Sequence, residues 1–141
     1  MKKRTEELMR MLEKNQNIVE LINSHDEEFS KMTLPECLAW LLSQYNIKKA
    51  DIINRSGLNQ IYAYQIFAGT KNPSRDKLIA LMFGFVLSVD DGNMLLKSAG
   101  LSSLYPRDKR DAVIIFGLNN KLRIHEVDEL LFELNLEIIS K

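Results

Sequence analysis

The sequence lacks most of the features that mark a specialised class of protein. Its 141 residues contain one cysteine and two histidines, and 19 basic residues balance 19 acidic ones. A single cysteine, Cys37, excludes an internal disulfide, and His25 and His125 have no spaced partner for a zinc site. No apolar run approaches the roughly 20 residues of a membrane span, and the start carries acidic residues with no following apolar block, unlike a signal peptide. We therefore expect no metal, no cofactor, no membrane partner and a cytoplasmic location.

Patterns for catalysis are also missing. Asp90 and Asp91 are adjacent, but at this position they are interpreted as acids at a helix start rather than as a catalytic dyad. The glycines are scattered and form no phosphate-binding loop, as at Gly84, Gly92 and Gly100. The sequence therefore predicts that the protein is not an enzyme.

What the sequence has is helical periodicity and an ordinary globular composition, with 45% apolar and 27% charged residues. Apolar side chains recur at intervals of three and four residues, and Thr33 with Glu36 has the pattern of a capped helix start. Cys37 belongs to one such apolar stripe, where it is interpreted as a small core residue. We predict an all-α fold.

The most informative stretch lies between residues 48 and 74. A short helix is predicted from Lys49 to about Ser56, Gly57 supplies a sharp turn, and Asn59 caps a second helix. In that second helix Ala63, Ile66 and Phe67 recur at helical spacing and are expected to face the core. The other side of the helix is then free to face a partner.

Two segments here resemble the phage-repressor and Cro-like helix-turn-helix family, often called XRE. They are the turn SGLN at 56–59 and the exit loop GTKNPS at 69–74, and the resemblance extends over roughly residues 34 to 88. The sequence departs from the family where Ile53 replaces the usual alanine and Ala63 the usual larger residue, an exchange that keeps the total volume. The resemblance implies a transcriptional regulator, commonly a repressor, that binds double-stranded DNA.

The resemblance also implies which residues meet DNA. Glutamine can bond adenine and isoleucine can meet a thymine methyl, whereas tyrosines at 62 and 64 are bulkier than usual and can instead contact phosphate, a protein partner or the core. The expected base contacts are Gln60, Ile61, Tyr62, Tyr64 and Gln65. The expected phosphate contacts, each with a solvated surface group as the alternative, are Lys49, Thr70, Lys71, Asn72 and Arg75.

Charge is distributed in agreement with this interpretation. Residues 46–77 contain six basic and two acidic side chains, and the flanking segments are each slightly acidic. Positive charge near the second helix suits phosphate, while the neutral whole disfavours indiscriminate binding.

The remaining chain divides into an N-terminal helical extension (1–32), the five-helix repressor-like helix-turn-helix domain (33–104) and a C-terminal helical hairpin (105–141). Residues 75–104 align without a gap to residues 110–139, a period of 35 that includes Arg75/Arg110 and Asp76/Asp111. The sequence favours a second copy of the hairpin over chance similarity. Pro106 and a cap at Asp108 mark the boundary between the two copies.

Two questions stay open at this stage. A homodimer can form through the C-terminal hairpin, around Phe116, Leu130 and Phe132, or through the N-terminal helix, although these residues can equally be core. The alternative function is a protein-interaction module, either an adaptor or an antitoxin-like partner, in which Ile61, Tyr62 and Tyr64 form an apolar contact.

Overall fold

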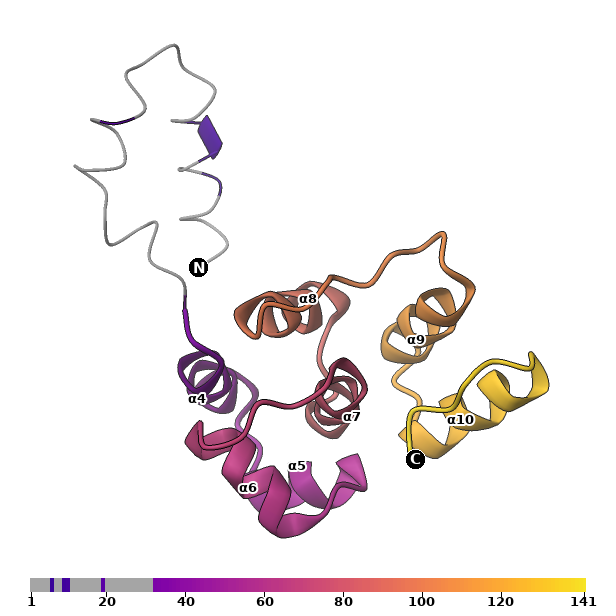
Figure 1. The fold of residues 1–141 in the computed structure, drawn as a ribbon, viewed down its shortest axis with the longest axis horizontal. Helices are drawn as coiled ribbons and strands as arrows, with labels where there is room; N and C mark the ends of the chain where they lie inside the picture. Colours follow the sequence, from indigo (N-terminus) through magenta and orange to yellow (C-terminus); the bar gives the residue numbers. More distant parts are fainter. Residues whose placement is uncertain (1–5, 7–8, 11–18, 20–31) are drawn as a thin grey trace. The chain divides into compact units, whose positions relative to one another are not determined.

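The computed structural model describes residues 32–141, together with residues 6, 9, 10 and 19 (Figure 1). The chain divides into two units, Met1–Lys31 and Met32–Lys141, and the second is described below. Apart from the few positions named, the expected N-terminal helical extension lies outside the described residues.

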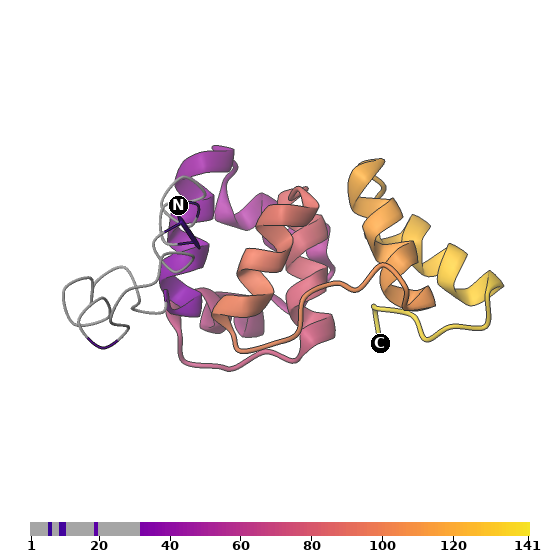
Figure 2. The same ribbon diagram turned by 90° about the horizontal axis from the view of Figure 1, so that it is seen from above.

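The described part of the chain contains seven helices and no strand, which confirms the all-α prediction. Short polar or glycine-containing turns connect most of them, and a longer connection separates the last two helices from the rest (Figures 1 and 2). The helices are α4 (Leu34–Tyr45), α5 (Lys49–Ser56), α6 (Gln60–Ala68), α7 (Arg75–Phe85), α8 (Val89–Ser98), α9 (Lys109–Asn119) and α10 (Ile124–Glu133).

Several helix starts are fixed by the caps that the sequence predicts. Thr33 Oγ1 accepts a hydrogen bond from the N–H of Glu36, whose carboxylate accepts one from the N–H of Thr33, so the capping box is complete. Asp108 Oδ1 likewise accepts the N–H of Asp111 at 2.9 Å at the start of α9. These bonds satisfy backbone donors that have no partner inside the helix.

Helix α7 is the centre of the unit, with α4, α5 and α6 on one side and α9 and α10 on the other (Figures 1 and 2). Every residue from Leu78 to Phe85 is buried. A Cβ at Gly84 would lie 2.3 Å from the carbonyl oxygen of Ile52, so this glycine allows α5 to approach α7 closely. The position of α5, and of the turn that follows it, therefore depends on α7.

The hairpins α7–α8 and α9–α10 repeat each other with the period of 35 residues found in the sequence. After the first helix of each, Val86 and Lys121 adopt left-handed conformations with φ of 61° and 53°. After the second helix, Gly100 and Asn135 do the same with φ of 73° and 58°. The two hairpins thus turn and end at equivalent positions, as the sequence alignment predicts.

Equivalent arginines close each hairpin. Arg75 Nε donates to the carbonyl oxygen of Ser102 at 3.1 Å, and Arg110 Nε donates to that of Glu137, 35 residues further on, at 2.8 Å. Backbone amides at the two exits are held in the same way, by Asn93 for Leu104 and by Asp128 for Ile139. Each hairpin is therefore tied to its own exit segment.

The two hairpins are joined by a reciprocal pair of salt bridges. Arg75 donates from both terminal nitrogens to the carboxylate of Asp111, at 3.0 and 2.9 Å. Arg110 donates in the same way to Asp76, at 2.9 and 3.1 Å. Such two-point pairs fix orientation as well as distance.

The carboxyl group of Asp111 is expected to make stability depend on pH. Burial alone raises its pKa, but hydrogen bonds from Arg75 and from the N–H of Tyr105 outweigh burial, so the pKa lies below its usual value. A carboxyl whose pKa is lower in the folded chain stabilises the fold above its unfolded pKa of about 4, and this contribution is lost as pH falls from there through the folded pKa.

We predict that Asp111→Asn lowers the free energy of unfolding by about 2 kcal/mol at pH 7, because it removes a charged hydrogen-bond acceptor. The difference from the unchanged chain should narrow below pH 4, as followed by urea unfolding at several pH values. Glu133→Gln, at an exposed position of α10, is the control and should change stability by less than about 0.5 kcal/mol. An equal loss at pH 7 and pH 3 would contradict a role for the Asp111 charge.

Candidate nucleic-acid interface

The turn between α5 and α6 is built from the residues that the sequence singled out. Gly57 ends α5 with φ of 72° and ψ of 6°, a left-handed conformation that favours glycine. The buried Ser56 accepts the N–H of Leu58 on its hydroxyl, and Asn59 Oδ1 accepts the N–H of Tyr62 at 3.0 Å. These contacts set the direction in which α6 leaves the turn.

Helix α6 presents one face to solvent. Gln60, Ile61 and Tyr64 are exposed and Gln65 is half-buried, and their spacing of one and four residues places them on one side of the helix. Ile61 is 71% exposed, so it adds apolar surface to this side of the helix. We call these four residues the α6 face. The opposite side of the helix is buried as predicted, at Ala63, Ile66 and Phe67.

Tyr62 differs from the other expected base contacts. Its side chain is half-buried and packs against the hydrophobic core. The structure thus brings four of the five residues together on the α6 face and places Tyr62 at its border.

Lys49 lies next to this face. Its ammonium nitrogen is 5.2 Å from the ring centroid of Phe67 and 6.0 Å from that of Tyr64, within the range of a cation–π contact. The sequence analysis placed Lys49 near DNA phosphate but missed its aromatic contacts. The signal for them was the spacing of three residues between Tyr64 and Phe67, which makes the two rings neighbours on the surface of α6.

The loop after α6 is held against the same helix. The N–H of Thr70 donates to the carbonyl oxygen of Gln65 at 3.0 Å. Gly69, with φ of 84°, lies so close to Pro35 that a Cβ would be 2.7 Å from the ring. Lys71 and Asn72 follow and are exposed, so the loop presents polar groups beside the α6 face.

Arg75 requires a correction. It was expected to contact DNA phosphate, but its guanidinium binds Asp111 and the carbonyl oxygens of Ser102 and Ser103. All three of its nitrogens are used in these bonds, and its side chain is only 24% exposed. We therefore remove Arg75 from the expected phosphate contacts. The repeated Arg-Asp pair at the 35-residue period was the sequence signal for this role.

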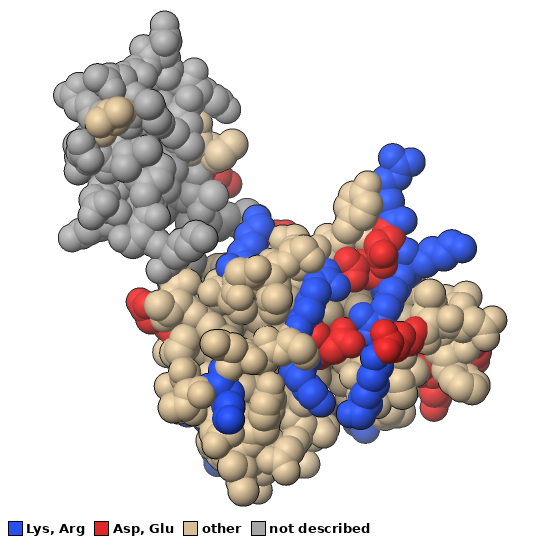
Figure 3. Space-filling model, in the orientation of Figure 1, with Lys and Arg blue, Asp and Glu red and all other residues tan. Residues whose placement is uncertain are grey.

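The electrostatic surroundings of α6 are those of a neutral helix with basic neighbours. The helix has no charged residue, while Lys48, Arg55 and Lys71 are exposed on the adjoining segments. Lysine and arginine are scattered among acidic groups over the face seen in Figure 3. Among the seven described helices only α6 has no acidic residue in its first turn, so the positive end of its dipole is not offset locally.

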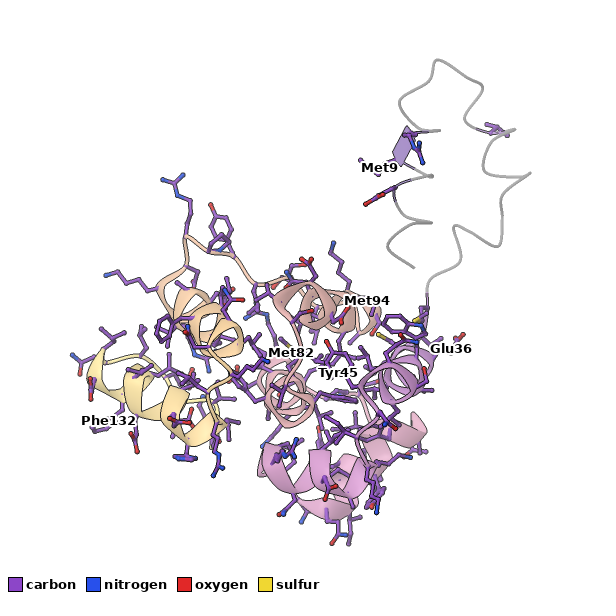
Figure 4. The ribbon with its side chains drawn as sticks, turned by 180° about the vertical axis from the view of Figure 1, so that it is seen from behind. Met9, Glu36, Tyr45, Met82, Met94 and Phe132 are labelled. Carbon is purple, nitrogen blue, oxygen red and sulfur yellow. The ribbon has the colours of Figure 1, made fainter. Side chains whose placement is uncertain are left out.

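Other polar groups in the described unit are used for structure. Tyr45, the last residue of α4 (labelled in Figure 4), donates to Asp91 at 2.6 Å and accepts the N–H of Ser88. Burial raises the pKa of Tyr45 and that of the Cys37 thiol. Over the described residues no three metal-binding side chains come together, and none of the helices has the length and apolarity to cross a membrane.

Comparisons of the chain with protein-family models, with curated proteins and with solved structures found no match. The function is therefore argued from the α6 face and its surroundings. Their distinctive property is an uncharged, partly apolar helix surface bordered by cations.

A glycine series tests how the turn beside this face is built. Gly57 and Gly100 have φ of 72° and 73°, and an added Cβ meets no atom within 4 Å at either position. We predict that Gly57→Ala and Gly100→Ala each lower the free energy of unfolding by about 1 kcal/mol, through backbone strain alone. Gly84→Ala should lower it by about 3 kcal/mol because its Cβ would overlap α5. The same loss of unfolding free energy for all three variants, measured by denaturant unfolding, would contradict the distinction between backbone strain and steric overlap.

Proposed function

We propose that this chain is a sequence-specific double-stranded DNA-binding transcriptional regulator that inserts α6 into the major groove. The observation that supports this most is the α6 face, which combines two amide side chains with an exposed isoleucine. Glutamine can form two hydrogen bonds with adenine, and isoleucine can pack on a thymine methyl. A repressor is the simpler outcome, because blocking a promoter requires only occupancy.

The proposal includes a repressor-like arrangement of five helices, α4 to α8, with α5 and α6 as the helix-turn-helix pair. It is supported by the left-handed Gly57, the cap at Asn59 and the exit loop 69–74, the segments that carry the resemblance to the XRE family. In such motifs the second helix reads base edges and the first lies across the backbone.

Phosphate contacts would come from the edges of the α6 face. Lys49 lies beside Tyr64, and Thr70, Lys71 and Asn72 are exposed in the loop that is bonded back to Gln65. These groups fix the register of a helix in the groove without reading sequence. Because α6 itself is uncharged, discrimination would depend on base contacts rather than on attraction to any duplex.

A regulator of this kind commonly binds two half-sites about 34 Å apart as a dimer. The expected pairing surfaces were the C-terminal hairpin and the N-terminal helix, and the latter lies outside the described residues. On the hairpin Phe116 is 52% and Phe132 is 76% exposed, whereas Leu130 is half-buried. Phe132 lies at the outer edge of α10 in Figure 4.

A second function is favoured by a specific observation. Ile61 and Tyr64 expose apolar surface on a helix that has no charge, as a protein-binding surface often does. The second candidate is therefore an adaptor or antitoxin-like module in which the α6 face binds a protein partner.

Selection from a random duplex library at physiological salt tests the proposal directly. We expect recovery of a sequence motif, arranged as a palindrome or a direct repeat if the protein binds as a dimer. Recovery of unselected sequences, with binding that disappears as salt rises, would reject sequence reading and favour the protein-binding function.

We predict that Gln60→Ala and Gln65→Ala each weaken binding to the selected site by about 1–3 kcal/mol, or roughly 5- to 150-fold in Kd. Affinity for random duplex should change little, as measured by fluorescence anisotropy on both duplexes. Gln44→Ala, at an exposed glutamine of α4, is the control and should change neither. Equal weakening on both duplexes would remove the base-reading role of these glutamines.

A further inference from the structure

The contact between the two hairpins has the form of a contact between two copies of one molecule. Arg75 binds Asp111 and Arg110 binds Asp76, where Arg75-Asp76 and Arg110-Asp111 occupy equivalent positions of the repeat. Residue i of one copy meets residue j of the other, and j meets i. This reciprocity is the property of a two-fold interface.

The helices show the same exchange. Helix α7 of the first hairpin packs against α10 of the second, and α8 of the first packs against α9 of the second. Exchanging the two hairpins converts each of these contacts into the other. The α7–α8 hairpin therefore has a surface that accepts a hairpin of its own kind.

We propose that two copies of this chain dimerise by exchanging their α9–α10 hairpins, each of which docks on the α7–α8 hairpin of the other copy. The docking surface is the side of α7–α8 that includes Arg75 and Asp76, and its occupant is a second copy of this chain. The dimer would hold two α6 helices in one particle, as two DNA half-sites require. Only this last consequence rests on the proposed function.

Charge complementarity supports this occupant. Each hairpin begins with an arginine followed by an aspartate. When two such dipeptides meet about a two-fold axis, the arginine of each faces the aspartate of the other. The bridges are half-buried, with 24% and 9% of the Arg75 and Asp111 side chains exposed and 19% and 26% of those of Arg110 and Asp76. At such positions an unmatched charge is costly, so the pairs select their partner.

Only a short part of the connection between the hairpins is exposed and not held by the first hairpin. Leu104 is buried and its N–H is bonded to Asn93, so the first hairpin holds the chain up to this residue. Residues 105–108 are exposed, and Asp108 already caps α9. Four residues span at most about 14 Å, so exchange requires two α7–α8 hairpins close together, as in a closed dimer. Exchange replaces each contact between the two hairpins of one chain by the same contact between two chains. The fraction of dimer should therefore rise with protein concentration.

Two single variants of the full chain test the exchange. In Asp76→Arg, two arginines oppose each other at positions 76 and 110, and in Arg110→Asp, two aspartates do. Neither variant can make this bridge within its own chain. When the variants are mixed, position 76 of the first matches position 110 of the second, and the other exchanged bridge is the original one.

We expect the mixture, after refolding together from urea, to contain mainly a heterodimer of one chain of each variant, identified by native mass spectrometry. Each variant refolded alone should show only the dimer fraction of the unchanged chain at the same concentration, because its closed and exchanged forms lack the same bridge. The control is the double variant, Asp76→Arg with Arg110→Asp, in which the bridge is restored within one chain. It should behave as the unchanged chain, whose dimer fraction should rise with concentration.

A mixture that contains only the separate variants would overturn the proposal, as would an unchanged chain that stays monomeric at every concentration. A mixture in which the two homodimers together equal the heterodimer, the statistical proportion, would also overturn it, and would place pairing at another surface such as Phe132. If these variants fail to fold, Arg75→Asp mixed with Asp111→Arg tests the same exchange at the other bridge. All measurements are made without DNA, so their outcome is independent of whether the chain reads a DNA sequence.

Discussion

Helix α7 is buried along its length from Leu78 to Phe85, and the neighbouring helices conform to this constraint. Helix α5 can reach it only because Gly84 leaves room for the Ile52 carbonyl. At the start of α7, Arg75 and Asp76 bind the second hairpin. One helix therefore positions both the turn that leads into α6 and the C-terminal hairpin. A disturbance of α7 should reach the α6 face even though α7 contributes no residue to it.

The two hairpins solve the same packing problem with side chains of exchanged size. In the first, Met82 of α7 lies over Gly92 of α8, where a Cβ would be 2.6 Å from the methionine methyl. In the second, the equivalent contact is Gly117 of α9 against Val127 of α10, at 2.4 Å. The large residue has moved from one helix to the other while the close approach is kept, as volume-conserving changes in a core allow. Glycine spacing alone would not have revealed this relation, because the glycines belong to different helices.

Sequence reasoning predicted the features that depend on neighbours along the chain. The Thr33 capping box, the left-handed Gly57 and the buried side of α6 follow from local hydrogen bonding and periodicity, and all are present. Contacts between residues far apart in the sequence were harder to predict. Arg75 was placed at DNA phosphate because it follows a basic loop, but the deciding factor was Asp111, 36 residues away. A carboxylate fixed in the fold offers an arginine two hydrogen bonds at a partly buried site, and sequence neighbours do not show that such a partner exists.

If the α6 face binds DNA as proposed, the use of Arg75 in the fold would affect how that face discriminates between duplexes. An arginine or lysine that forms a salt bridge within the fold is not available to neutralise a DNA phosphate. The attraction of a protein to any duplex scales with the number of phosphates neutralised. With α6 uncharged and Arg75 paired, the remaining nearby cations are Lys49 and Lys71, with Lys48 just before α5 and Arg55 near its end. Under the proposed function, low affinity for random duplex would give high specificity only if the base contacts of Gln60, Ile61 and Gln65 are good. On the same proposal, a weakly charged DNA-binding surface would gain more from a second α6 helix, because two half-sites bound together multiply a modest affinity.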